Sequence, residues 1–344
     1  MDINLLRFAK ATTLALVAAA IGPTSQAHAD SVAEFYSGKT VTITVGFTPG
    51  GGYDLYARLA AQFLGRHIPG KPNVVVSNMP GGGGVRAALH LFKVAPKDGT
   101  ALTIIVQSVG FDSVLGQLPV RADQFNYVGR LADSVETQLL WHTSPTKSLE
   151  DAKSRKTVIG STGPSSPSAI VPKLLNDTVG TQFVIAGGYQ GTSESGLAME
   201  RGEVEGTLKS LEALTTSHQD WLTGRKVNVI WQLAMKPDQR ISNVPAIGAL
   251  GDDPEGRAIL RLIAGTAEIG RSLATAPGVP SDRVAALRRA FDAMAADPEF
   301  QATAKKRNVG LATAPGTSLQ ALIAEAMNTP GDVVDRVRRV IATK

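Results

Sequence analysis

The stretch TVTITVGFTPGGGYD, residues 40–54, decides the fold class. Its first part, Thr40–Phe47, is a run rich in β-branched residues, which predicts a strand. Its last residue begins Asp54–His67, where apolar residues recur at helical spacing. Glycines separate the strand from the helix, and strands that alternate with helices are the building units of α/β proteins. In open sheets of this kind, ligands bind at loops that follow the carboxyl ends of strands.

The same strand–loop–helix unit recurs along the chain. Further strands are expected at Asn73–Asn78, Thr100–Gln107, Thr137–Trp141, Thr157–Gly160, Gln182–Ala186, Glu205–Leu208, Val227–Gln232 and Arg271–Thr275. Further helices are expected at Val85–Phe92, Ser168–Asp177, Thr192–Arg201, Ser281–Met294, Ser318–Met327 and Asp332–Ile341. This alternation predicts an α/β fold with mostly parallel sheets. No linker separates two halves of the chain, so we expect domains that are joined by crossing strands.

Composition narrows the class of protein. The 344 residues are enough for roughly two domains, and 43% of them are hydrophobic, which provides for a sizeable core. The formal net charge is +5, from scattered basic residues, which indicates a mild preference for anionic solutes and no nucleic-acid partner. Cysteine is absent, so disulfides, thiol nucleophiles and zinc–thiolate sites are excluded.

Residues 1–29 have the pattern of a secretory signal peptide. Arg7 and Lys10 are basic, residues 11–21 form an uncharged apolar run, and Ala27-His28-Ala29 is a small-x-small cleavage site. The apolar run is about half the ~20 residues that a transmembrane helix needs, so a membrane anchor is the weaker alternative. We therefore expect cleavage after Ala29 and a periplasmic protein.

Glycine concentrates in four loops at strand-to-helix junctions. These loops are residues 48–54 (TPGGGYD), 80–84 (PGGGG), 160–166 (GSTGPSS) and 187–193 (GGYQGTS). Glycine lets a ligand approach backbone N–H groups, and the start of a helix favours an anion. Each loop alone could be a simple tight turn. Four loops at equivalent positions predict a site for a carboxylate or phosphate that is bound largely by main chain.

Motifs for catalysis or cofactors are weak. The chain has no P-loop and no G-x-S-x-G elbow, and its histidines lack metal-ligand spacing. Residues 82–87 (GGGVRA) fit the dinucleotide pattern, but a run of four glycines satisfies it easily and no acidic residue ends the next strand. Glu203, Glu205 and Glu212 have no recognisable acid–base partner and are expected to be solvated or structural. We expect no enzyme activity, no cofactor and no metal.

Charged side chains near the loops are few. Arg58, Arg86 and Lys209 are the cations there. Arg86 could bind a ligand carboxylate or stand on a solvated helix face, whereas Arg58 is expected to be structural. Asp54 is expected to cap its helix, because a carboxylate repels an anionic ligand.

These motifs together resemble a known family over the whole chain that follows the signal peptide. The matching segments are Phe47 to Asp54 (FTPGGGYD), Asn78 to Gly84 (NMPGGGG), Ala95 to Leu102 (APKDGTAL), Tyr189 to Gly191 (YQG), Asn243 to Pro245 (NVP) and Ala276 to Pro280 (APGVP). In this order and spacing the sequence resembles the extracytoplasmic solute receptors of tripartite tricarboxylate transporters, also called Bug proteins.

The resemblance implies a two-lobed, type II periplasmic-binding-protein fold, often called a Venus flytrap. Each lobe would be a mostly parallel sheet flanked by helices, with residues 30–136 and 268–344 in lobe 1 and residues 137–267 in lobe 2. The implied ligand is a small organic anion, namely a di-, tri- or aromatic carboxylate, and the implied partners are the membrane permease subunits. A monomer is expected. Alternatives are a receptor for a membrane sensor kinase and an exported hydrolase or transferase.

The sequence departs from the family pattern at three positions. Tyr53 stands where a small hydroxyl residue is usual, Val85 replaces the usual Asn, and Ser165 replaces a glycine. A standard C4-dicarboxylate is therefore not assumed. The residues expected to bind the ligand are Thr48, Gly50, Gly51, Gly52, Tyr53, Asp54, Gly81, Gly82, Gly83, Gly84, Arg86, Gln107 and Ser108 in lobe 1, and Ser161, Thr162, Ser165, Ser166, Tyr189, Gln190 and Gly191 in lobe 2.

Overall fold

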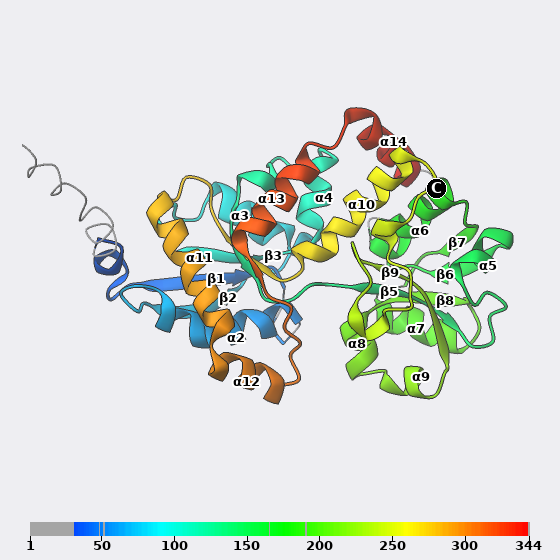
Figure 1. Cartoon of the computed structure of the whole chain (residues 1–344), viewed down its shortest axis with the longest axis horizontal. Coiled ribbons are helices and arrows are strands. Elements are labelled where there is room, and N and C mark those ends of the chain that lie inside the picture. The colour runs from blue at the N-terminus through cyan, green and yellow to red at the C-terminus, as the bar shows by residue number, and fades with distance from the viewer. Residues whose placement is uncertain (1–30, 48, 51, 165, 190, 343–344) are drawn as a thin grey trace, which may run out of the picture.

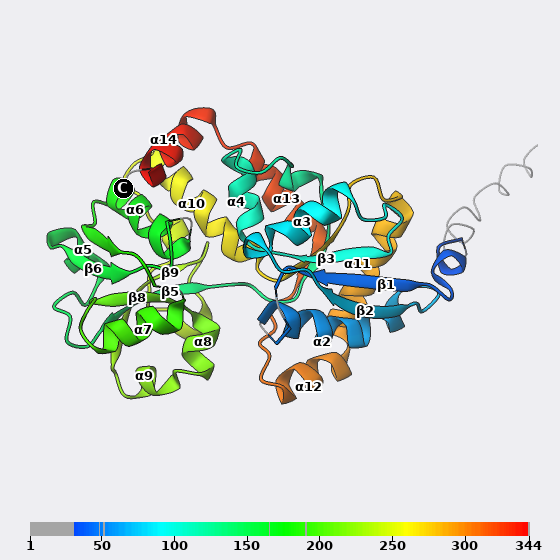
Figure 2. The same ribbon diagram turned by 180° about the vertical axis from the view of Figure 1, so that it is seen from behind.

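The chain folds into two lobes, each built on one β-sheet (Figure 1). The computed structural model describes residues 31–342 except 48, 51, 165 and 190. The signal-peptide prediction therefore lies outside the described residues. Figure 2 shows the same two lobes from behind, with α10 lying between them.

The sheet of the first lobe has six strands in the order β11-β4-β10-β3-β1-β2. The strands are β1 (Thr40–Val45), β2 (Asn73–Asn78), β3 (Ala101–Ile105), β4 (Asn126–Arg130), β10 (Ser272–Thr275) and β11 (Ala314–Pro315). Strand β1 pairs in parallel with β2 and β3, whereas β10 pairs antiparallel with β3 and β4. The carboxyl ends of β1, β2 and β3 therefore lie along one edge, together with the start of β10.

The sheet of the second lobe has five strands in the order β7-β6-β8-β5-β9. The strands are β5 (Glu136–Trp141), β6 (Thr157–Gly160), β7 (Phe183–Ala186), β8 (Gly206–Ser210) and β9 (Val227–Leu233). Strand β6 pairs in parallel with β7 and β8, and β5 pairs antiparallel with β8 and β9. The start of β5 thus lies beside the carboxyl ends of β8 and β9.

Helices cover both faces of each sheet (Figure 1). They are α2 (Gly52–His67), α3 (Val85–Lys93), α4 (Ser108–Val114), α5 (Leu149–Ser154), α6 (Pro167–Val179), α7 (Thr192–Glu200), α8 (Leu211–Thr216), α9 (Gln219–Thr223), α10 (Pro254–Ile269), α11 (Ser281–Ala296), α12 (Pro298–Lys306), α13 (Gly316–Met327) and α14 (Gly331–Ala342). Short 3-10 turns lie at η1 (Gly82–Gly84), η2 (Ala122–Gln124), η3 (Gln239–Ile241) and η4 (Ile247–Ala249).

Four hydrophobic clusters hold these layers together. In the first lobe, one cluster joins the sheet to α2, α11 and α12, and a second joins its other face to α3 and α13. In the second lobe, one cluster includes α6, α10 and α14, and the other includes α7, α8 and α9. The burial of apolar side chains on both faces is the main stabilising contribution to such a layered fold.

The α/β class and the two-lobed arrangement that the sequence predicts are confirmed. The expected mostly parallel sheets are, however, mixed, because the strands that follow each crossing between lobes run antiparallel to their neighbours. Helix α14 packs against α6 and α10, on the side of the second lobe. The predicted division of residues between the two lobes stays a prediction.

Candidate functional site

The glycine-rich loops of the first lobe pack directly against one another. A Cβ atom on Gly46, at the end of β1, would lie 2.5 Å from Cα of Gly84. Gly84 has a φ of +95° and lies against the side chains of Phe47 and Val106. Residues with a side chain rarely adopt this backbone conformation, so glycine allows the two loops to approach this closely. Gly81, Gly82 and Gly83 also have positive φ values and are exposed.

Asp54 holds the first loop in place from the first turn of α2. Its carboxylate accepts hydrogen bonds from Gly50 N (2.9 Å), Arg58 Nε (2.8 Å) and Asn78 Nδ2 (2.9 Å). These bonds, the one from Arg58 foremost, lower the pKa of Asp54 to about 2. Helix α2 begins at Gly52, so Asp54 lies inside the helix and braces the loop from there, which differs from the expected cap position.

Tyr53 connects the first loop to the end of the third strand. Its ring stacks on Phe47 with centroids 4.8 Å apart, and its hydroxyl accepts a hydrogen bond from Gln107 N at 3.4 Å. Ser108 follows as the first residue of α4. Arg86 is exposed, and its guanidinium lies 3.4 Å from Pro80 O. The structure thus brings Tyr53 and Gln107 together, while Arg86 stays on the surface.

In the second lobe, the third loop is organised by its own hydroxyl groups. Ser168 Oγ accepts a hydrogen bond from Thr162 N (3.1 Å) and lies 3.1 Å from Ser161 Oγ. Ser161 Oγ in turn accepts from Gly163 N, and Ser166 Oγ donates to Gly163 O. Sequence reasoning expected these serines to face a ligand and did not single out Ser168. The hydrogen bonds show that they hold the loop before α6.

The fourth loop lies against the third. A Cβ atom on Gly160 would lie 3.1 Å from Ser195 Cβ and 3.2 Å from the ring of Tyr189. Tyr189 is partly exposed, as is Gly191, which precedes α7. Of the expected ligand-binding residues, Thr48, Gly51, Ser165 and Gln190 lie outside the described residues.

A charged cluster joins the two lobes where the chain crosses between them. Arg271, just before β10, forms an ion pair with Glu212 of α8, with Nη2 and Oε2 3.2 Å apart. Arg271 Nη1 also donates to Asp133 O at 2.9 Å. The guanidinium lies 5.5 Å from the ring centroid of Tyr53 and 5.3 Å from that of Tyr56. From the sequence, Arg271 is expected in a strand and has no assigned role, and Glu212 is expected to be solvated or structural. The sequence does not predict that the two residues pair.

Two further charged side chains belong to the same junction. Glu136 is the first residue of β5. Burial raises its pKa to about 7; the attraction of Arg271 opposes this increase, and the repulsion of Glu212 adds to it. Lys209, near the end of β8, is 3% exposed and contacts His218 Nε2 at 3.1 Å. Burial lowers the pKa of Lys209. In the part of the chain that the structure describes, no salt bridge reaches this lysine.

A cavity of about 250 Å³ opens beside this cluster. Its walls include Tyr56, Asp133, Glu212, Arg240 and Arg271, so both lobes contribute to it. The charged cluster and the cavity lie at the carboxyl ends of β4 and β8 and at the starts of β5 and β10. Gly52 is close by, and its Cβ would lie 3.6 Å from Arg271 Nη2.

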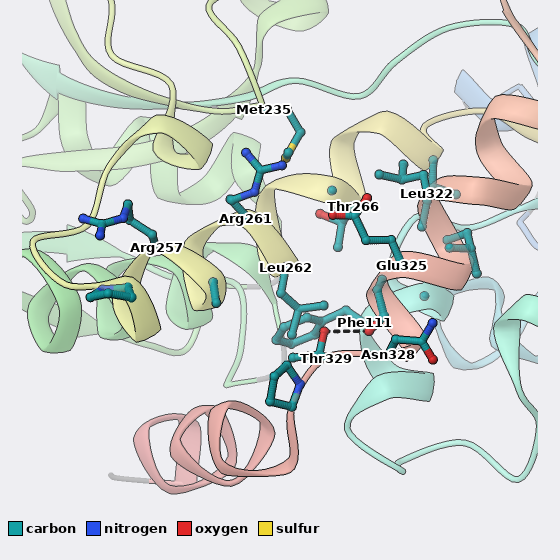
Figure 3. Close-up of a pocket in the computed structure, with 18 residues that line it drawn as sticks. Phe111, Met235, Arg257, Arg261, Leu262, Thr266, Leu322, Glu325, Asn328 and Thr329 are labelled. Atoms are coloured by element: carbon teal, nitrogen blue, oxygen red, sulfur yellow. Dashed lines mark hydrogen bonds between the residues drawn. The ribbon is translucent and has the colours of Figure 1, made fainter.

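A second, larger cavity of about 710 Å³ lies among α4, α10 and α13. Figure 3 shows Phe111 and Leu262 meeting in it, and Arg257 and Arg261 of α10 also line it. Its walls are helix faces together with Met235 and the segment between α13 and α14, and they contain none of the four glycine-rich loops. It therefore does not coincide with the predicted site.

The described residues offer neither a cluster of metal ligands nor a helix that could span a membrane. They contain no group of three or more His, Asp or Glu side chains that could hold a metal ion. Among the described residues, 31–342 except 48, 51, 165 and 190, no helix is long and apolar enough to cross a bilayer.

Comparison with known proteins gives one family and many similar structures. The model of the tripartite tricarboxylate transporter family receptor matches residues 57–338. Comparison with curated protein sequences gave no match.

Three of the similar structures illustrate the likeness. A TctC solute-binding protein from Polaromonas, without ligand, is 19% identical, with a TM-score of 0.69 over 88% of this chain and 99% of that chain. An R. palustris protein with adipate is 21% identical, with a TM-score of 0.55 over 88% and 97%. MatC from Rhodopseudomonas palustris with bound malate is 20% identical, with a TM-score of 0.56 over 88% and 99%. At these identities the likeness establishes the fold.

Proposed function

The chain belongs to the tripartite tricarboxylate transporter receptor family, and from this premise we propose that it captures a small organic carboxylate between its two lobes and delivers it to the permease of such a transporter. The observation that carries the proposal is the packing of glycine-rich loops at the shared edge formed by the ends of β1, β2 and β3. Ligands of open α/β sheets bind at such an edge.

Main-chain donors suit a carboxylate there. Gly81, Gly82 and Gly83 are exposed, and a Cβ atom on Gly83 would meet no other atom within 4 Å. Loop N–H groups without neighbouring side chains can donate to an anion. A few charge-assisted hydrogen bonds of about 1.5–3 kcal/mol each are adequate for micromolar binding, which requires ~8 kcal/mol.

The similar structures that hold adipate and malate support a carboxylate ligand here. The proposed ligand class is therefore a di-, tri- or aromatic carboxylate. The predicted signal peptide of residues 1–29 supports a periplasmic location, where a receptor meets both its solute and its permease. Closure of the lobes around the ligand would report occupancy to the permease.

A ligand screen tests the proposal. The purified chain without residues 1–29 is heated with adipate, malate, citrate or benzoate, and each compound that raises the unfolding temperature is then measured by calorimetry. Glucose and putrescine, neither of which carries a carboxylate, serve as neutral and cationic controls. We expect at least one carboxylate to bind with micromolar affinity and neither control to bind. Binding of glucose or putrescine, with no binding of any carboxylate, would contradict the proposal.

A further inference from the structure

We propose that Arg271 recognises the charge of the ligand, and that Glu212 holds the position on its guanidinium that a ligand carboxylate takes. The inference rests on the proposed function and deepens it, because it adds a charged contact from a side chain to a site described so far as main chain. Under this proposal, Glu212 and the ligand compete directly for Arg271.

Arg271 lies at the edge of the first sheet where the glycine-rich loops meet. It precedes β10, whose start lies at the same edge of the sheet as the carboxyl ends of β3 and β1. Its Nη2 lies 3.6 Å from where a Cβ of Gly52 would be, and Gly52 is the first residue of α2. A buried guanidinium beside a helix start adds a full positive charge to the partial charge of the backbone N–H groups.

The guanidinium of Arg271 is held firmly by its neighbours. Arg271 is 9% exposed, and the rings of Tyr53 and Tyr56 lie within cation–π distance of it. Its Nη1 donates to the carbonyl of Asp133. A charged group in a fixed position is oriented before the ligand arrives, which lowers the entropic cost of binding.

The hydrogen-bonding capacity of the Arg271 guanidinium is only partly used. Glu212 reaches Nη2 with one oxygen at 3.2 Å, and Arg271 Nε is buried without a hydrogen-bond partner among the described residues. Arginine and carboxylate pair best through two parallel hydrogen bonds. Since Glu212 belongs to the opposite lobe, the single contact leaves room for a ligand carboxylate to take its place.

The charged side chains around Arg271 favour an anionic ligand. Glu136 and Lys209 both act on this junction, and Glu212 faces Glu136 as a like charge. An anion that displaced Glu212 from Arg271 would enter a junction that holds two cations, Lys209 of β8 and Arg271 just before β10, with Glu136 as the other acidic group. This arrangement selects a carboxylate over its neutral amide analogue.

A double-mutant cycle tests the inference by calorimetry. The probe is whichever of adipate, malate, citrate and benzoate binds the wild-type protein most tightly. We expect Arg271→Gln to weaken binding about ten- to hundred-fold, the range of a charge-assisted hydrogen bond. We expect Glu212→Gln to strengthen it several-fold, because a neutral amide competes less for the guanidinium. In the double variant the gain from Glu212→Gln should disappear.

Arg155→Gln is the matched control. Arg155 also pairs with a glutamate, Glu205, at 2.7 Å, but at the amino ends of β6 and β8, away from the proposed site. It should lower the unfolding temperature and leave the affinity for the probe unchanged.

The outcomes separate the two proposals. If the wild-type protein binds none of the carboxylates, the proposed function fails. If it binds but Arg271→Gln binds equally well, only the role of Arg271 is overturned. If Glu212→Gln weakens binding, Glu212 supports the site and the competition is overturned. Should Arg271→Gln fail to fold, the result for Glu212→Gln still decides whether the pair competes with the ligand.

Discussion

Asn78 donates a hydrogen bond from Nδ2 to Asp54 Oδ1 over 2.9 Å, which joins the loop after β1 to the end of β2. The same amide also donates to Phe47 O at 2.9 Å. Two glycine-rich segments are therefore held together by one carboxylate and one amide. Glycine alone would leave these loops free to move, so their common orientation depends on Asp54 and Asn78.

Asp54→Asn should lower stability at neutral pH. The folded pKa of Asp54 is about 2, below its ordinary value of 3.8, so its contribution is present above pH 4 and is lost as the pH falls toward 2. The difference corresponds to about 2 kcal/mol. Urea unfolding should show this loss at pH 7 and almost none at pH 2. The exposed Asp252→Asn serves as the control, and an equal loss at both pH values would contradict the pKa argument.

Gly46→Ala should destabilise the first lobe. A Cβ at this position would lie 2.5 Å from Gly84 Cα and 2.9 Å from Gly84 O, so the two loops would have to move apart. Overpacking of this kind costs about 1–3 kcal/mol. Gly187→Ala is the control, because its Cβ would meet nothing within 4 Å. Thermal unfolding of both variants measures the effect, and equal unfolding temperatures would show that the loops are not tightly packed.

Sequence periodicity predicted most of the strands, because β-branched runs such as those of β1 and β2 are strong signals. It missed β4 (NYVGR), whose short and mixed composition lacks alternation, and α4 (SVGFDSV), whose serines and glycine are weak helix formers. It also missed α10 and α12, although α10 is one of the longest helices. Tertiary packing stabilises these elements more than local preference does.

The same limit applies to the site. The loops could be located from glycine alone, because backbone conformation is a local property. The pairing of Arg271 with Glu212 could not, because the two residues are 59 positions apart and belong to different lobes. The serines of the third loop, which are predicted ligand donors, bond to one another and to Gly163, a network that the sequence pattern does not indicate. Their contact with a ligand stays a prediction.

Ser168→Ala should therefore disturb the third loop. Ser168 is 3% exposed, and its hydroxyl accepts from Thr162 N while contacting Ser161 Oγ. Removing it leaves a backbone N–H without its partner, at a cost of about 1–3 kcal/mol. Urea unfolding measures the loss, with the exposed Ser193→Ala as control. A stability unchanged from wild type would show that water replaces the hydroxyl.

Glu136 makes the stability of the folded chain decrease as the pH rises. Its folded pKa of about 7 lies above its ordinary value of 4.5, mainly because burial disfavours the carboxylate. Between these values the unfolded chain releases a proton that the folded chain keeps, so stability falls as the pH rises from 4.5 to 7 and then stays level.

Glu136→Gln removes that loss, since the amide does not ionise. The variant should match the wild type at pH 4 and exceed it at pH 8 by on the order of 3 kcal/mol. The Glu136 carboxylate is attracted by Arg271 and Lys209 and repelled by Glu212. It also repels an anionic ligand, so binding of a carboxylate to the wild type should weaken above pH 7, where Glu136 is ionised. In the variant this pH dependence should flatten. Urea unfolding measures the effect on stability at both pH values, and calorimetry measures the effect on binding. A variant less stable than the wild type at pH 8 would show that Arg271 and Lys209 instead stabilise the ionised Glu136.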